Sequence, residues 1–400
     1  MFDVTTSRTP VGFRARVGRL AQNLVPNADQ WAYSRDRAAD RRARSKAAGY
    51  RDLVSAAQGL GPVGEREPHV VVVPTEGPSH GTWVPGVRNL YFEAAQTLTE
   101  ISGPERVTSF FAEPGETPMQ WQRRLIDYLG DTNATHLLTH IEGDPGNLNS
   151  WTWDSFWEIV SPRWDGVFLG CMFDSSYRFT AAKAKIMAKM SDRFVLVDIC
   201  MPMDGALIRN RCESGPVNMP MSLASQRLLD ERLAGVTPAY DLSFFGVLYD
   251  YRIKLIERLQ SEGITVAVNP HRKDGAEDGR STRANQPAWL EYMAGIAASK
   301  MTVNFSQSNA GPFEQLKTRV MEVGLAGTYL LTDDRDRTKR CWDEGSFSVF
   351  DEPADLLETS QRLLARPEDL GHATTEFHDR ARYLARNHYW GAMEATLRAR

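Results

Sequence analysis

Two cations and one carboxylate lie within six residues of each other in the C-terminal part of the sequence. Lys317, Arg319 and Glu322 occupy a segment in which apolar residues recur at helical spacing. The first turn of a helix has free backbone N–H groups and the positive end of the helix dipole, so this segment could bind a diphosphate. Glu322, one turn further along, could accept hydrogen bonds from the two hydroxyls of a ribose. The spacing therefore predicts a site for a nucleotide sugar.

The stretch that must position these groups is residues 311–336. Gly311 and Pro312 end a preceding strand, apolar residues then recur on one helical face, and Gly327 stands where the helix must end. Glycine suits that place because it adopts a positive φ without steric cost. The apolar run 328–332 follows and is typical of a strand buried in a parallel sheet. We therefore expect a loop, a helix, a strand and an acidic exit turn.

Strand and helix patterns alternate through the rest of the chain. Apolar runs that predict strands begin near residues 69, 107, 135, 166, 193, 240, 264 and 301, and helical segments lie between most of them. This alternation favours an α/β fold with parallel sheets and right-handed crossovers. A connector at 216–239 divides the strands into two groups. Ligands of such sheets bind beyond the carboxyl ends of the strands.

Several short patterns in the second half occur together and in order. They are the opening YDLSFFG with Gly246 and Arg252, the residues Lys317, Arg319, Glu322 and Gly327, the run LLTDD at 330–334, the segment 343–370, and the tail HDRARYLARNHYW at 378–390. With this order and spacing, residues 240–390 resemble the C-terminal half of CgeB-type glycosyltransferases, which are members of the GT-B superfamily.

The resemblance implies two Rossmann-like, doubly wound parallel-sheet α/β domains that face each other across a cleft, the second holding the donor. The donor-binding residues that we expect are Gly246, Arg252, Asn304, Lys317, Arg319, Glu322 and Gly327. Cations and helix amides can stabilise the departing diphosphate, so a metal is not required, as is usual in this superfamily. We therefore expect no cofactor beyond a nucleoside diphosphate sugar as co-substrate, taken to be of the UDP type.

The acceptor hydroxyl must be positioned or deprotonated, and several side chains could do this. Asp174 lies where CgeB-like sequences carry an aspartate after an apolar strand, and His80 is apt because an imidazole titrates near neutral pH. Glu314 lies eight residues before Glu322, a spacing that in retaining members of the superfamily places both acids at the donor. Further candidates on the acceptor side are Glu76, His140, Glu142 and Asp144. Each could equally be a turn or cap residue, so the choice of base and the stereochemical outcome stay open.

Two further patterns have competing interpretations. Asp334 and Asp336 form an Asp-x-Asp sequence, which binds a metal in the other glycosyltransferase fold, but a turn aspartate is the ordinary explanation. Trp151, Trp153 and Trp157 could form a surface on which a sugar or base stacks. Tryptophans at such spacing more often pack a helix onto its sheet.

The first 60 residues are rich in arginine. Two solvated helices outside the first domain would explain these arginines. The alternative is a basic arm that touches an anionic acceptor, a membrane surface or DNA, and the interspersed aspartates weaken this alternative. We assign residues 1–66 to an Arg-rich helical extension and linker, 67–235 to an N-terminal acceptor domain, 236–370 to a C-terminal donor domain, and 371–400 to terminal helices that cross back to the first domain.

The composition is that of an ordinary globular protein. The 400 residues suffice for two domains, with 42% hydrophobic and 24% charged residues, and the net charge of −4 gives no general attraction to nucleic acid or membranes. The four cysteines show no metal-ligand spacing, and no apolar run approaches the roughly 20 residues that span a membrane. We expect a cytoplasmic protein.

The sequence thus predicts a metal-independent glycosyltransferase, a hexosyl- or pentosyltransferase that uses a nucleoside diphosphate sugar. A nucleotide-sugar epimerase or hydrolase on the same fold, and a non-catalytic two-domain protein that binds nucleotides or nucleic acid, are the alternatives, because a fold alone does not fix function. The acceptor stays open among a small molecule, a glycan, a protein and modified DNA, and so does the oligomeric state.

Overall fold

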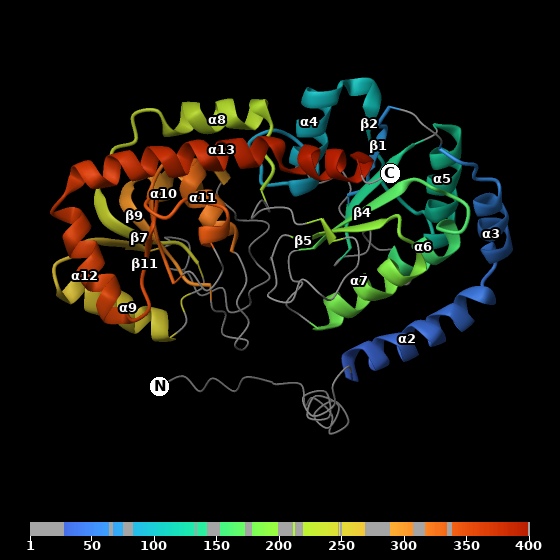
Figure 1. Ribbon diagram of the computed structural model, residues 1–400, viewed down its shortest axis with the longest axis horizontal. Helices are drawn as coiled ribbons and strands as arrows, with labels where there is room; N and C mark the ends of the chain where they lie inside the picture. Colours follow the sequence, from blue (N-terminus) through green and yellow to red (C-terminus); the bar gives the residue numbers. More distant parts are fainter. Residues whose placement is uncertain are drawn as a thin grey trace.

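Two parallel β-sheets, each flanked by helices, lie side by side along the long axis of the molecule (Figure 1). The computed structural model describes residues 28–63, 67–74, 83–132, 134–141, 153–172, 178–198, 211–212, 219–246, 248, 250–268, 289–306, 317–333 and 338–398.

The first sheet has the strand order β2-β1-β3-β4-β5-β6, and every described pair of neighbours is parallel. Its strands are β1 (Val70–Val72), β2 (Val107–Ser109), β3 (His136–His140), β4 (Val167–Met172), β5 (Phe194–Asp198) and β6 (Arg211–Cys212). Its helices are α4 (Leu90–Ser102), α5 (Pro118–Asp131), α6 (Trp153–Val160) and α7 (Arg178–Met190), with a short 3-10 turn, η2 (Pro104–Arg106). The chain changes direction of winding between β1 and β3, so this edge is a topological switch point.

The second sheet has the order β11-β10-β9-β7-β8 and is likewise parallel. Its strands are β7 (Tyr240–Phe244), β8 (Val266–Val268), β9 (Ser299–Asn304), β10 (Tyr329–Thr332) and β11 (Ser348–Val349). Its helices are α9 (Asp250–Ser261), α10 (Trp289–Ala297), α11 (Thr318–Ala326), η6 (Thr338–Arg340) and α12 (Pro353–Leu364). The switch point falls between β7 and β9. The expected fold class, an α/β protein with two doubly wound Rossmann-like sheets, is confirmed.

One helix of 32 residues, α13 (Pro367–Arg398), runs across both domains (Figure 1). Its first half buries Phe377 and Ala381 against the second domain. Its second half buries Tyr389 and Met393 among the strands of the first domain. This helix therefore ties the two cores together with apolar surface, the main favourable term in folding.

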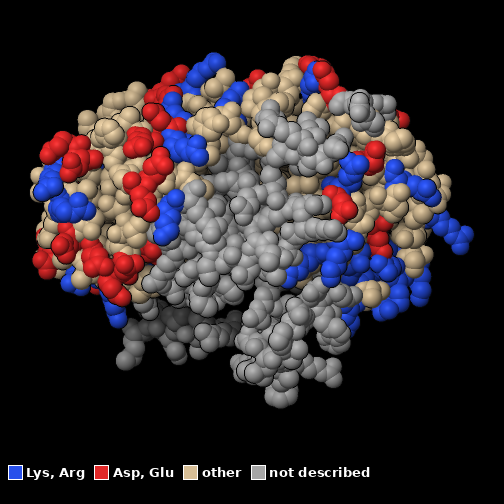
Figure 2. All heavy atoms as spheres, in the orientation of Figure 1, with Lys and Arg blue, Asp and Glu red and all other residues tan. Residues whose placement is uncertain are grey.

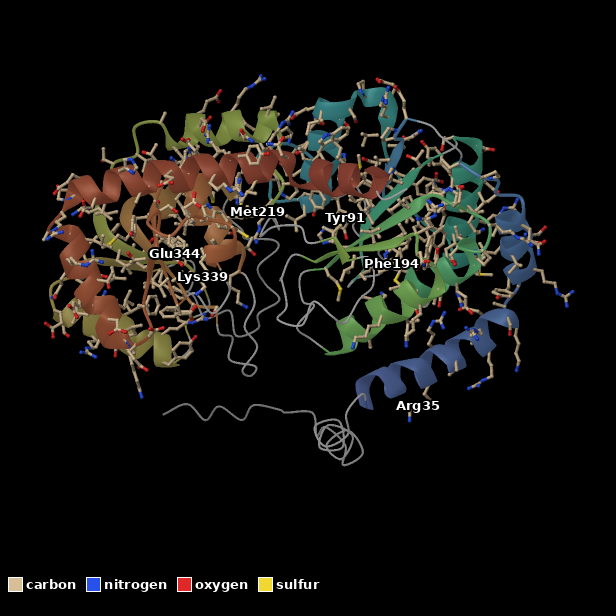
Figure 3. The ribbon with its side chains drawn as sticks, viewed as in Figure 1. Arg35, Tyr91, Phe194, Met219, Lys339 and Glu344 are labelled. Carbon is tan, nitrogen blue, oxygen red and sulfur yellow. The ribbon has the colours of Figure 1, made fainter. Side chains whose placement is uncertain are left out.

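The connector helix α8 (Leu223–Leu233) lies beside α13 (Figure 1). Ser222 caps its start, and the Met221 N–H just before it donates to the Ala385 carbonyl of α13 at 3.0 Å. Figure 3 shows Met219, at the entrance to α8, and Tyr91, at the start of α4, in the central part of the molecule. The connector between the two domains therefore packs against α13.

The arginine-rich N-terminal part contains α2 (Ala28–Ser45) and α3 (Tyr50–Gln58), which pack outside the first sheet. Arg37 binds Asp154 at 2.8 Å and Glu158 at 2.6 Å, both on α6, and Arg44 is 1% exposed. Figure 2 shows blue side chains gathered on the side where α2 lies. Several of these arginines therefore hold α2 against the first domain.

The tryptophans of α6 are core residues. Trp153 and Trp157 are 1% and 0% exposed and pack edge-on against Phe168 of β4. The interpretation of these two side chains as a sugar-stacking surface is therefore wrong, because the same rings fill the space between helix and sheet. Trp151 lies outside the described residues.

In the described part of the chain, no helix is both long enough and apolar enough to cross a membrane.

Candidate functional site

A pocket of about 270 Å³ opens where the carboxyl ends of β7 and β9 meet the start of α11. It is lined by Arg88, Phe244, Phe245, Gly246, Arg252, Tyr292, Asn304, Phe305, Lys317, Thr318, Arg319 and Glu322. Six of the seven residues expected to bind a donor are among them. The place agrees with the rule that open parallel sheets bind ligands at their switch points.

The carboxylate of Glu322 lines this pocket, and the residue is 1% exposed. The Tyr292 hydroxyl donates to its Oε2 atom at 2.6 Å, and Arg319 Nε lies 3.4 Å from the same oxygen. Arg88 Nη1 lies 3.2 Å from Oε1. Oε1 itself accepts no hydrogen bond from the described residues, so one buried acceptor remains available to a ligand hydroxyl.

Tyr292 fixes the orientation of this carboxylate. Burial, reinforced by the negative charge of Glu322, raises the pKa of Tyr292 far above its usual range. The phenol therefore keeps its proton throughout the physiological range and acts as a permanent hydrogen-bond donor to Glu322. The guanidinium of Arg319 lies over the Tyr292 ring, 5.4 Å from its centroid, which adds a cation–π contact.

The start of α11 offers positive charge to the same space. Lys317 stands at the N-cap with extended backbone, and no side chain caps the helix there. Arg319, in the first turn, has its Nε and Nη1 atoms buried with no hydrogen-bond partner among the described residues. Backbone N–H groups, the helix dipole and two basic side chains thus converge on one point, which suits an anion.

Arg252 and Asn304 are held more rigidly. The Arg252 guanidinium lies between 5.2 and 5.3 Å from the ring centroids of Phe244, Tyr251 and Phe305, and its Nε donates to the Tyr251 hydroxyl at 2.7 Å. Asn304 and Thr332 are paired in register on β9 and β10, and Asn304 Nδ2 donates to Thr332 Oγ1 at 3.1 Å. Both side chains line the pocket from fixed positions.

The two glycines have different functions. A methyl group on Gly246 would lie 3.0 Å from the Phe244 ring and 3.6 Å from Arg319 Nη2, so glycine at this position leaves room for the Phe244 ring. Gly327 ends α11 in the left-handed conformation, with φ 66°, and does not belong to the pocket lining. Its part is to stop the helix, as the sequence predicts.

His140 is the acceptor-side candidate that the structure describes. It ends β3, is 4% exposed, and its ring lies 4.8 Å from that of Tyr91. Burial lowers the pKa of His140 to about 3. The imidazole is therefore neutral at pH 7 and a weak base, which disfavours it for acceptor activation.

The other candidates lie outside the described residues. They are the catalytic candidates Asp174, His80 and Glu314, the acceptor-side residues Glu76, Glu142 and Asp144, and the Asp334 and Asp336 pair. Within the described ranges, no group of three or more metal-ligating side chains comes together.

Two pocket residues that contact Glu322 were not predicted from the sequence. Arg88 lies just before α4 in the first domain, and Tyr292 lies on α10. Neither is close in sequence to the α11 segment, and only tertiary packing brings them to Glu322. The sequence signal for these two residues is weak. It consists of a basic residue beside the α4 N-cap Asn89 and a tyrosine within a largely apolar helix.

Residues 252–398 match the sequence model of a protein family described as Glycosyl transferase-like. This match covers most of the second domain, including α11, together with α13. A search of curated proteins finds no match to the chain.

The chain is also similar to solved structures at low sequence identity. One is a sucrose-phosphate synthase from Thermosynechococcus elongatus, with a TM-score of 0.48, 12% identity, and coverage of 83% of this chain and 100% of that one. Another is Anabaena HepE in complex with UDP and glucose, with a TM-score of 0.47, 10% identity, and coverage of 82% and 100%. A third is T4 phage BGT in complex with UDP and Mn²⁺, with a TM-score of 0.43, 10% identity, and coverage of 83% and 99%.

Proposed function

We propose that this protein is a glycosyltransferase that moves a sugar from a nucleoside diphosphate sugar to an acceptor hydroxyl without a metal. The second domain holds the donor, and the first domain presents the acceptor. Within the glycosyltransferase-like class, the C-terminal motifs favour a CgeB-type enzyme of the GT-B superfamily. The proposed donor is a UDP-sugar, and the transferred group is a hexose or pentose. The proposed location is the cytoplasm.

One observation carries this proposal: a buried carboxylate and several cations meet at an uncapped helix start. Glu322 supplies an acceptor for ribose hydroxyls, Arg319 lies about one turn before it, and Lys317 lies at the N-cap of the same helix. These residues fall inside the region that matches the glycosyltransferase-like family. A nucleoside diphosphate carries both a ribose diol and an anion, so the groups in this pocket are complementary to it.

The same cations serve the chemical step. The bond between the anomeric carbon and the diphosphate oxygen breaks, a bond forms from that carbon to the acceptor oxygen, and the acceptor proton passes to a base. Negative charge grows on the departing diphosphate, where Lys317, Arg319 and the start of α11 stabilise it more than they stabilise the bound donor. Preorganised donors of this kind can replace a metal ion.

The base and the acceptor contacts belong to the first domain in this proposal. Asp174 is the preferred base and His80 the second choice, and both follow strands whose carboxyl ends face ligands in such sheets. Glu314 remains a candidate for the donor side. The acceptor class, which ranges from small molecules and glycans to proteins and modified DNA, is left open.

A binding screen tests the proposal. The melting temperature of the full chain is measured with UDP, ADP, GDP and dTDP, and then with sugar nucleotides of the base that stabilises it. Ligand at about 100 times its Kd should add roughly 2.7 kcal/mol to the free energy of unfolding and raise the melting temperature. A protein that none of these nucleotides stabilises would contradict the proposal. Transfer measured with and without EDTA then tests metal independence, since lost transfer would restore a metal requirement.

A further inference from the structure

Arg88 is the residue that the first domain contributes to the described lining of the donor pocket. The other lining residues come from β7 and the segments that follow it. Arg88 Nη1 approaches Glu322 Oε1 to 3.2 Å, although the two residues are more than 200 positions apart in the chain. This contact joins the two domains inside the candidate site.

The backbone that carries Arg88 is held in place by the second domain and the connector. The Gly86 N–H donates to Ser225 Oγ on α8 at 2.9 Å. Gly86 has a φ of 77°, and a methyl group there would lie 3.1 Å from Leu228 and 3.4 Å from Leu290. The segment is therefore clamped between α8 and α10, and Asn89 begins α4 immediately after it. The backbone around Gly86 therefore fixes the position of Arg88 at the edge of the pocket.

The described lining of the pocket contains more cations than carboxylates. The described lining carries four cations, contributed by Arg88, Arg252, Lys317 and Arg319, and one carboxylate, that of Glu322. Two of those cations, Arg88 and Arg319, approach the same carboxylate. Arg88 and Arg319 therefore share one carboxylate, and the diphosphate of a sugar nucleotide would bring about two further negative charges to them.

The contact between Arg88 and Glu322 is also easily exchanged. Oε1 of Glu322 accepts no hydrogen bond from the described residues, so the 3.2 Å approach is electrostatic rather than directional. The Arg88 side chain is 36% exposed, so it can move, whereas the carboxylate is 2% exposed. A ribose hydroxyl would give Oε1 the hydrogen bond that it lacks.

We propose that Arg88 is a further donor-binding residue that exchanges partners when the donor arrives. The ribose hydroxyls take Glu322, and the guanidinium turns from Glu322 to the diphosphate. The planar fork of arginine suits that partner because it can donate two parallel hydrogen bonds to phosphate oxygens. Donor binding thereby links the start of α4 to α11. This inference rests on the proposed function and adds to it a residue supplied by the other domain.

The test compares the affinity for a nucleoside diphosphate with the affinity for the nucleoside alone. Affinities for UDP are measured by titration calorimetry, and those for uridine by ligand-observed NMR, on the full-length wild type, Arg88→Ala and Arg88→Lys. If another base binds better, the corresponding diphosphate and nucleoside replace this pair. Arg88→Ala should weaken diphosphate binding about tenfold or more and leave nucleoside binding unchanged or tighter, since Glu322 loses a competing partner. Arg88→Lys should recover part of the loss because it keeps the charge but not the fork.

Controls keep the outcomes distinct. Arg123→Ala, which removes an exposed arginine paired with Asp127 on α5, should change neither affinity. The melting temperature of each variant without nucleotide reports any general loss of structure. Unchanged diphosphate affinity in Arg88→Ala, or equal losses for diphosphate and nucleoside, would overturn the role of Arg88 while leaving the proposed function in place. A wild-type protein that binds no nucleoside diphosphate would instead overturn the proposed function, and this inference with it.

Discussion

Gly324 of α11 faces Ala381 of α13 so closely that a methyl group on Gly324 would lie 2.5 Å from the Ala381 Cβ atom. The ring of Phe377 would be 3.2 Å from the same methyl group. His378 Nδ1 also lies 2.7 Å from the Gly324 carbonyl oxygen. The helix that forms one wall of the donor pocket is therefore seated directly on the helix that joins the two domains.

Replacing Gly324 with alanine should destabilise the protein. The added methyl group overpacks the contact between α11 and α13, and overpacking typically costs about 1–3 kcal/mol. Urea unfolding of the full chain measures the difference. Gly371→Ala is the matched control, because Gly371 is also helical and a methyl group there meets nothing within 4 Å. That control should be neutral or stabilising, and an equal loss in both variants would contradict the packing explanation.

Stability should also depend on the protonation of Glu93. This carboxylate of α4 accepts hydrogen bonds from the Ser222 N–H at 2.7 Å and from the Ser225 hydroxyl, both at the start of α8. Burial raises the pKa of Glu93 to about 7, an effect larger than the opposing one of these hydrogen bonds. The folded protein therefore holds a proton that the unfolded chain releases near pH 4.5, so the contribution of this group falls as pH rises from about 4.5 to about 7.

Glu93→Gln should remove that dependence. A shift of this size corresponds to something on the order of 3 kcal/mol, and the amide oxygen can still accept from the Ser222 N–H. Urea unfolding of both proteins at several pH values between 4.5 and 8 gives the difference, which should grow with pH in favour of the variant. A constant difference over that range would show that Glu93 titrates at its ordinary value.

The sequence was most informative where a site is built from neighbouring residues. Lys317, Arg319 and Glu322 belong to one helix start, so local spacing alone predicted that they would share a space. The strand and helix alternation likewise predicted the two parallel sheets, because most of the buried strands contain several apolar residues in a row.

It was least informative where chain geometry or distant packing decides. The start of α4 at Leu90 is set by Gly86, which takes a positive φ, and by Asn89, which caps the helix. Arg88 and Tyr292 reach Glu322 from separate elements, and no local pattern encodes that meeting. Contacts between residues of different domains depend on how the helices pack, and the packing of helices cannot be read from a single sequence.

Tyr292→Phe should loosen the donor site without unfolding the protein. The ring and its packing against Phe245 remain, but the hydrogen bond to Glu322 is lost. A hydrogen bond to a charged group contributes about 1.5–3 kcal/mol, so affinity for the stabilising nucleoside diphosphate should fall roughly tenfold or more. Calorimetry measures it, with Tyr383→Phe, whose side chain is 58% exposed, as the control. Unchanged affinity would mean that Tyr292 does not orient the carboxylate.

Arg319→Ala should lower turnover more than it lowers stability. Its guanidinium lies at the start of α11, where we expect charge to grow on the departing diphosphate. Loss of one preorganised donor can cost about a hundredfold in kcat. The contacts that the Arg319 guanidinium makes with the Tyr292 ring and with Glu322 should contribute less than this to stability. Rates with the sugar nucleotide identified in the binding screen, compared with melting temperatures, separate the two. Parallel losses of rate and stability would assign Arg319 a structural part only.

Glu322→Ala should weaken binding of the nucleoside diphosphate by at least about tenfold, because the ribose hydroxyls lose their charged acceptor. Pyrophosphate provides the internal comparison, since it has no ribose and is repelled by the same carboxylate. Its affinity should stay the same or rise when Glu322 is removed, since Arg88 and Arg319 then face only the anion. Calorimetry with both ligands, and with Glu358→Ala on the exposed face of α12 as the control, distinguishes ribose recognition from a general loss of the pocket. If the variant loses affinity for the nucleoside diphosphate and for pyrophosphate equally, Glu322 supports the structure of the pocket and does not recognise the ribose.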